Sequence, residues 1–104
     1  PHWDRILPTY RTNSPNTLIY VNKSIPSSTY KQNKIKSPYV TSITLTIDNR
    51  SIDIFSLYNP PETGDPSDNA PIRATISSLG PPSPSRSLLL LGDFNRHHPL
   101  WSGI

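Results

Sequence analysis

The chain has 104 residues, of which 33% are hydrophobic and 13 are proline, and it contains no cysteine. A chain of this length forms at most one small domain with a limited core, and neither a disulfide framework nor a thiolate zinc site can stabilise it. Ten Lys and Arg against seven Asp and Glu give a net charge of +3, which permits a polyanionic partner without requiring one. No apolar stretch approaches the roughly 20 residues of a membrane helix, so we expect no membrane partner.

The first half of the chain has the patterns of β-strands. Residues 17–21 (Thr-Leu-Ile-Tyr-Val) form a short β-favouring run between clusters of Ser, Pro and Asn. In residues 39–47, apolar residues come to alternate with Thr and Ser, which is the period of a half-buried strand. Residues 48–50 (Asp-Asn-Arg) then favour a turn, and residues 52–58 form the next strand. These two strands are predicted to pair as a hairpin.

The second half has the pattern of a loop followed by a helix. Residues 60–66 contain three prolines, so the preceding strand must end in a loop there. A helix capped by Ser67 or Asp68 is predicted to run to Leu79, and the Gly-Pro-Pro sequence after it is a stop signal. The apolar face of this helix is expected to consist of Ile72, Ile76 and Leu79.

A run of four leucines, residues 88–91, predicts a further strand that is apolar on both faces. Such a strand is expected to be central, covered on each side by other layers. Strands combined with a helix place the chain in the α/β class. The basic cluster of Lys31, Lys34 and Lys36 is interpreted as a solvated loop. Because the chain opens with Pro1 and not with Met, we expect it to be cut out of a longer protein.

Polar residues follow the leucine run directly, as Gly92-Asp93-Phe94-Asn95. In an extended chain, side chains two residues apart point the same way, so Asp93 and Asn95 would project together beyond the end of the strand. A carboxylate accepts hydrogen bonds and an amide can donate them, so the pair can hold a water or leaving oxygen and a phosphate oxygen. Gly, Asp and Asn are also good turn residues, and the residues alone leave both interpretations open.

The same four residues resemble the G-D-x-N motif of the endonuclease/exonuclease/phosphatase superfamily, which follows an apolar strand. Residues 96–101 (Arg-His-His-Pro-Leu-Trp) resemble the form found in the apurinic-endonuclease-like domains of non-LTR (LINE-type) retrotransposons. Residues 57–61 (Leu-Tyr-Asn-Pro-Pro) resemble the family's strand ending in Tyr-x-Pro, and residues 18–23 resemble an earlier strand. The resemblance implies a fragment of a two-sheet α/β sandwich, in which residues 1–104 are the middle portion of one domain.

The resemblance also assigns roles to single residues. Asp93 matches the aspartate that orients or activates the attacking water or protonates the leaving oxygen, and Asn95 matches the asparagine that holds the scissile phosphate. Tyr58 matches the tyrosine that donates to that phosphate, although a strand-end aromatic with its hydroxyl in water has the same pattern. His98 is a secondary candidate, interpreted as a loop-fixing residue. His97 and His98 make a poor metal pair, because adjacent side chains diverge in an extended segment.

The family's chemistry implies Mg²⁺ or Mn²⁺ as cofactor. The metal-binding glutamate of the family is expected just upstream of Pro1, so no metal ligand is expected within the chain. The implied function is metal-dependent nicking of target DNA by a retrotransposon-derived endonuclease, linked to a reverse transcriptase and inactive as this piece alone. An active eukaryotic element would work in the nucleus. The alternatives are a phosphatase on the same fold and a decayed retroelement remnant without catalysis.

Overall fold

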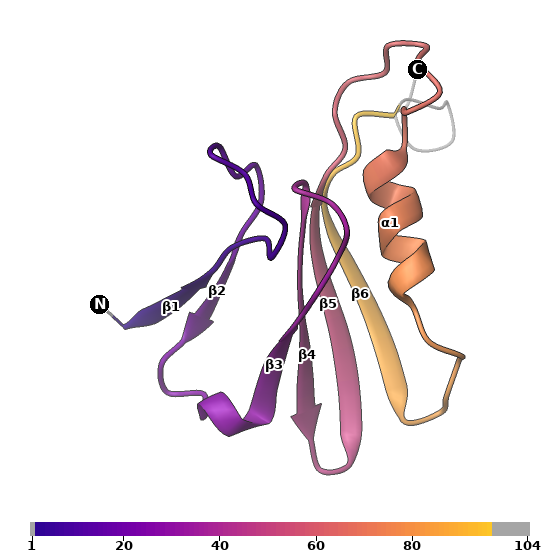
Figure 1. The fold of residues 1–104 in the computed structure, drawn as a ribbon. Helices are drawn as coiled ribbons and strands as arrows, with labels where there is room; N and C mark the ends of the chain where they lie inside the picture. The colour runs from indigo at the N-terminus through magenta and orange to yellow at the C-terminus, as the bar shows by residue number, and fades with distance from the viewer. Residues whose placement is uncertain (1, 97–104) are drawn as a thin grey trace.

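The computed structural model describes residues 2–96. A two-stranded sheet, a four-stranded sheet and helix α1 follow one another across the molecule (Figure 1). The elements in chain order are β1 (Trp3–Ile6), β2 (Ile19–Asn22), the 3-10 helix η1 (Ser27–Thr29), β3 (Tyr30–Asn33), β4 (Val40–Ile47), β5 (Arg50–Tyr58), α1 (Ala70–Ser78) and β6 (Arg86–Asp93). This arrangement confirms the expected α/β class. In this part of the chain no helix is long and apolar enough to cross a membrane.

Strands β4 and β5 form the predicted hairpin, because their alternating patterns meet at a two-residue turn. The antiparallel register ends with Ile47 opposite Arg50. Between them, Asp48 and Asn49 have φ values of 50° and 64°, the left-handed conformation that a tight hairpin turn requires at both central positions. Asn and Asp tolerate this conformation better than most residues, so the local sequence fixes the register of the hairpin.

Strands β1 and β3 have no apolar run and were not predicted from the sequence. β3 pairs antiparallel with β4 and contains Lys31, so the interpretation of the basic cluster as a loop is wrong for this residue. β1 pairs antiparallel with β2, which begins at Ile19 and not at Thr17. The Thr17 side chain is buried instead, and its hydroxyl donates to the carbonyl oxygen of Ser56 at 2.8 Å. This bond ties the segment before β2 to β5.

The leucine strand is not central in the described part of the chain. β6 lies at the edge of the four-stranded sheet, in the order β3-β4-β5-β6, and pairs parallel with β5. The side chains of residues 88–91 are 40% to 53% exposed. The expectation of cover on both faces is therefore wrong within residues 2–96, where β5 is the strand beside it.

The core lies between helix α1 and the sheet face beneath it. Its buried members are Ile35, Val40, Phe55 and Leu57, against which Ile72, Ala74 and Leu79 pack. Phe55 and Leu57 are two residues apart on β5, so the strand period places both on the helix side. Burial of these apolar side chains is the main favourable term that holds α1 on the sheet.

Helix α1 exists as predicted, but its start and its buried face differ. It is preceded by Asn69, with φ of 67°, and not by Ser67 or Asp68. The Asp68 carboxylate instead accepts hydrogen bonds from the loop residues before it. Thr75 lies on the buried face, and Ile76 is 60% exposed. Ile76 follows Thr75 directly and therefore lies about 100° around the helix from it.

A partly buried ion pair joins β5 to β6 on the helix side of the sheet. Asp53 is 8% exposed, and its carboxylate accepts from Arg86 Nε at 2.6 Å and from an Arg86 terminal nitrogen at 2.7 Å. Thr44 on β4 donates to the same carboxylate at 2.6 Å. Burial raises the pKa of Asp53, but the hydrogen bonds from Arg86 and Thr44 and the Arg86 charge outweigh it, so the pKa lies below its ordinary value.

The lowered pKa of Asp53 predicts an acid-dependent loss of stability. A carboxyl with a depressed folded-state pKa stabilises the fold above its unfolded pKa of about 4, and this contribution is lost as the pH falls through the folded-state pKa. We expect Asp53→Asn to lower the free energy of unfolding by about 1 to 3 kcal/mol at pH 7, less than for a fully buried pair because Arg86 is partly exposed. Thermal midpoints of both proteins measured from pH 7 to pH 2 should converge at low pH. Equal midpoints at pH 7 would contradict this prediction.

The exposed leucines of β6 predict self-association of the 104-residue chain. An edge strand with apolar side chains and unpaired backbone groups is a template for pairing with another chain. Leu89→Lys combined with Leu91→Lys should increase the monomer fraction in sedimentation velocity, because charges on an edge strand oppose pairing. Ile76→Lys is the matched control, since Ile76 is at least as exposed as these leucines but lies on the helix. An equal effect of the control would show that general hydrophobicity, and not the strand edge, drives association.

Candidate active site at the ends of β5 and β6

The predicted residues Tyr58 and Asp93 lie side by side where β5 and β6 end. They are partners in the parallel register of the two strands. Leu57 faces the core under α1, so Tyr58, the next residue, points to the opposite face of the sheet. Paired residues share a face, so Asp93 points there as well. The fold therefore brings together two of the three residues that the sequence motif singled out.

Gly92 is what allows β6 to approach β5 at this point. Its φ is 145°, and a Cβ atom at this position would lie 1.8 Å from the carbonyl oxygen of Leu57. No side chain fits in that space, because real Cβ contacts are much longer. The glycine of the Gly-Asp-Phe-Asn motif is thus required by the contact with β5, whatever the function of the residues after it.

Asp93 and Asn95 form a turn, and the expected extended geometry is wrong for Asn95. The strand ends at Asp93, and Asn95 has a left-handed φ of 47°. The Asn95 backbone N–H donates to the Asp93 carboxylate at 3.1 Å, which is an Asx turn. The Asn95 side-chain nitrogen donates to the carbonyl oxygen of Asn59 at 2.8 Å. The turn interpretation therefore explains the presence of Asp93 and Asn95 in part, because both side chains make hydrogen bonds that hold the turn.

The side chains of Asp93 and Asn95 can each form further hydrogen bonds beyond those in the turn. The Asp93 residue is exposed, and a carboxylate has about four acceptor positions, of which the Asn95 N–H takes one. An amide nitrogen carries two hydrogens, so the bond to Asn59 leaves a second donor on Asn95. An exposed acceptor beside an amide donor and a tyrosine can bind water and an oxyanion. The arrangement is compatible with acid–base work at a phosphate ester.

Sequence reasoning missed the residues that support the turn. Asn59 is fully buried, and its side-chain nitrogen donates to the Phe94 carbonyl oxygen at 2.9 Å and to Asn69 Oδ1 at 3.2 Å. Arg96 donates to the same Asn69 oxygen at 2.8 Å and to the carbonyl oxygen of Pro60 at 2.9 Å. Asn59 follows a strand and precedes two prolines, so from the sequence it resembled a loop residue. In the sequence, only its position between Tyr58 and the prolines could have indicated this supporting role.

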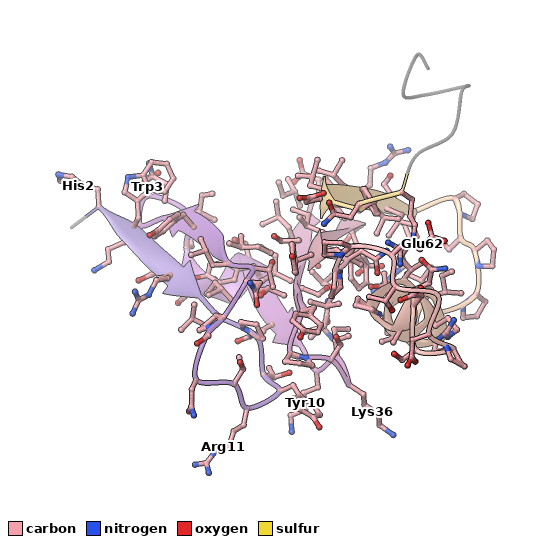
Figure 2. The ribbon with its side chains drawn as sticks, turned by 90° about the horizontal axis from the view of Figure 1, so that it is seen from above. His2, Trp3, Tyr10, Arg11, Lys36 and Glu62 are labelled. Atoms are coloured by element: carbon pink, nitrogen blue, oxygen red, sulfur yellow. The ribbon has the colours of Figure 1, made fainter. Side chains whose placement is uncertain are left out.

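A cleft of about 360 Å³ adjoins this supporting cluster. Lys36, Tyr39, Asn69 and Arg96 contribute to its walls. The ring of Tyr39 packs edge-on against Tyr58, with ring centres 5.9 Å apart, so the cleft and the end of β5 share an aromatic contact. Figure 2 shows Lys36 on the same side of the molecule as Arg11. Lys36 and Arg96 are therefore the cationic side chains that line this cleft, whose walls do not include Asp93.

The described residues do not by themselves fit a magnesium site. Within residues 2–96, no three His, Cys, Asp or Glu side chains lie together in a way that could hold a metal ion. Asp93 is the one carboxylate among Tyr58, Asp93 and Asn95, and Mg²⁺ prefers several oxygen ligands in octahedral geometry.

Several residues singled out in the sequence have other positions. His97, His98 and the remainder of the Arg-His-His-Pro-Leu-Trp segment after Arg96 lie outside the described residues. His2 and Trp3 lie at the start of β1, on the side of the two-stranded sheet away from β6 (Figure 2). Trp3 is 52% exposed, so its indole does not contribute to the core.

Comparison with known proteins gives one match. A family model described as "Endonuclease-reverse transcriptase" matches residues 52–104, which is half of the chain and includes Tyr58, Asp93 and Asn95. A search of curated proteins found no match, and a search of solved structures also found none. The matched segment begins in β5 and contains α1 and β6, the elements that bring Tyr58 and Asp93 together. The chain belongs to the endonuclease-reverse transcriptase family, within the endonuclease/exonuclease/phosphatase superfamily.

Proposed function

We propose that the protein carrying this chain hydrolyses a phosphodiester bond in DNA and thereby nicks the target site of a retrotransposon. The observation that carries the proposal is the juxtaposition of Tyr58 and Asp93 by the β5–β6 register, within the segment that matches the family. Arg96 directly after Asn95, Lys36 in the adjoining cleft and the net charge of +3 support a polyanionic substrate. The proposed partner enzyme is a reverse transcriptase, to which the family description refers.

The chemistry of priming specifies the bond. A polymerase extends a 3′-hydroxyl, so the nick must break the bond between phosphorus and the 3′ oxygen. Water attacks phosphorus and loses a proton, a 5′-phosphate forms, and the 3′ oxygen leaves and gains a proton. In this proposal Asp93 handles one of these proton transfers, while Asn95 and Tyr58 donate hydrogen bonds to the phosphate oxygens. Mg²⁺ or Mn²⁺ is the proposed cofactor, and such an ion would supply neutralisation of charge on the phosphate.

Two other functions predict different behaviour. A phosphatase on the same fold would hydrolyse a soluble phosphomonoester and leave a supercoiled plasmid intact. A decayed remnant would bind nucleic acid without cleaving either substrate. Nicking of a plasmid in Mg²⁺, lost when EDTA removes the metal, is the result that favours the endonuclease.

Substitution of Asp93 and Asn95 tests the assignment of roles. In the natural full-length protein, Asp93→Asn should lower the nicking rate by about 10² to 10⁴, because it removes a proton-transfer group, and asparagine still accepts the Asx-turn bond. Asn95→Gly should lower it by about 10² to 10³, since glycine adopts the left-handed φ but has no amide donor. The double variant should lose less than the product of the two factors if both serve one site. Initial rates of plasmid nicking measure all three.

Asp65→Asn is the matched control for Asp93→Asn. Asp65 is also an exposed Asx-turn aspartate, whose carboxylate accepts the Ser67 backbone N–H at 2.8 Å. This variant should nick at the wild-type rate. All variants should keep their thermal midpoints within a few degrees and still bind DNA, because affinity rests mostly on phosphate contacts. An Asp93→Asn protein that nicks as fast as the wild type would contradict the catalytic assignment of Asp93 and support a role in the turn alone.

A further inference from the structure

Asn59 makes more contacts to the catalytic turn than its position in a proline-rich loop suggests. Its backbone N–H donates to the Asp93 carbonyl oxygen at 2.8 Å, and its own carbonyl oxygen accepts from the Asn95 side chain at 2.8 Å. Its side-chain nitrogen donates to the Phe94 carbonyl oxygen at 2.9 Å. One residue therefore bonds to three consecutive residues of the Gly-Asp-Phe-Asn motif.

The orientation of the Asn59 amide is unambiguous. Phe94 and Asn69 present oxygen atoms to it, and a backbone carbonyl oxygen accepts hydrogen bonds but never donates them. The group facing them must be the nitrogen. The Asn59 Oδ1 atom is buried and has no hydrogen-bond partner among the described residues. A buried unpaired acceptor is costly, so an apolar residue of the same size would be favoured here if filling space were the only role.

Besides Asn59, the turn is supported by its own Asx bond and by Arg96, which donates to the Asn95 carbonyl oxygen at 2.7 Å and to Asn69 Oδ1 at 2.8 Å. Asp93 and Phe94 are exposed, and they end an edge strand. Asn95 is in the left-handed region, which asparagine tolerates better than most residues but which is still less favourable than the ordinary helical or extended regions. The bonds from Asn59 join this turn to the buried end of β5 and, through Asn69, to the start of α1. Packing alone would not hold the turn in one conformation.

We propose that Asn59 is a positioning residue, whose amide holds the Asp93–Asn95 turn in the orientation needed to engage a phosphate. The proposal rests on the proposed function, since a phosphate is the ligand that Asp93 and Asn95 would share. Asn59 does not touch the reacting atoms. It acts through the Phe94 carbonyl, which lies between the two site residues, and through Asn69, which Arg96 also binds.

Two substitutions test this role by removing the donor in different ways. Asn59→Leu keeps the side-chain volume without hydrogen bonding, and Asn59→Asp keeps the shape but turns an acceptor toward the Phe94 carbonyl. In the natural full-length protein, both should lower kcat for plasmid nicking about 10- to 100-fold while KM changes less than about threefold. Asn33→Leu is the matched control, because Asn33 donates to Ser42 and Thr44 on β4 and not to the turn. The control should keep the wild-type kcat.

Amide hydrogen exchange gives a readout that does not depend on activity. In Asn59→Leu, exchange of the Asn95 N–H, which donates to the Asp93 carboxylate, should become at least about tenfold faster. The β4–β5 ladder amides should keep their wild-type exchange rates. This pattern together with the kcat loss supports positioning. A wild-type kcat in both Asn59 variants overturns it, and so does a kcat loss that comes with faster exchange throughout β4 and β5 and an equally lowered thermal midpoint.

The two proposals fail in different ways. A wild-type protein that does not nick DNA in Mg²⁺ overturns the proposed function. The exchange measurement would then still decide whether Asn59 holds the turn. A wild type that nicks, with Asn59 variants that nick equally well, overturns only the positioning role.

Discussion

The approach of Gly92 to Leu57 is the contact on which the rest of this structure depends. A parallel pair between β5 and β6 aligns Tyr58 with Asp93, and it exists at that point because Gly92 has no Cβ atom to meet the Leu57 carbonyl. Any side chain there would move β6 away from β5. The Asx turn and its bonds to Asn59 would then lose their alignment, since both begin directly after this contact. Glycine is thus required at position 92 by the close approach of the two backbones. The positions of Asp93 and Asn95 depend on this contact.

An ion pair stabilises the pairing of β5 and β6 at the opposite end of the two strands. Asp53 and Arg86 join β5 to β6 on the helix side, and Thr44 adds β4 to the network. The ion pair and the Gly92 contact lie at opposite ends of the ladder, so the two strands are held at both ends. The core under α1 fills the space between them with Phe55 and Leu57. Polar and apolar interactions therefore favour the same strand register.

Local patterns in the sequence predicted those elements whose partners are close in the chain. The β4–β5 hairpin follows from alternation and from a two-residue turn of Asp48 and Asn49, and this information is contained within about twenty residues. β3 could not be found in this way, because its sequence Tyr-Lys-Gln-Asn has no apolar period and its strand conformation depends on pairing with β4. The leucine run correctly indicated a strand. It could not indicate what lies beside that strand.

The candidate site was predictable only where a motif marks it. Asp93, Asn95 and Tyr58 were found through their resemblance to family motifs, and the register supports the pairing of the first and last. Asn59 and Asn69 were not found, because their roles depend on contacts across 35 and 27 positions, to Phe94 and Arg96. The helix start was misplaced for a related reason. Aspartate is a residue type that often caps a helix. The Asp68 carboxylate instead accepts a hydrogen bond from the Gly64 backbone N–H in the loop before it.

The long connection between β5 and β6 has a consequence for how the protein folds. The hairpin closes over a two-residue turn, whereas the bond from Asn95 to Asn59 spans 36 positions, with α1 in the intervening chain. Contacts between distant positions pay a larger entropy of loop closure, and they form late when local contacts are available. We therefore expect the hairpin to form early on the folding pathway and the Asp93–Asn95 turn to form late. On unfolding the order is expected to reverse, so the arrangement of the candidate site would be lost while most of the sheet still persists.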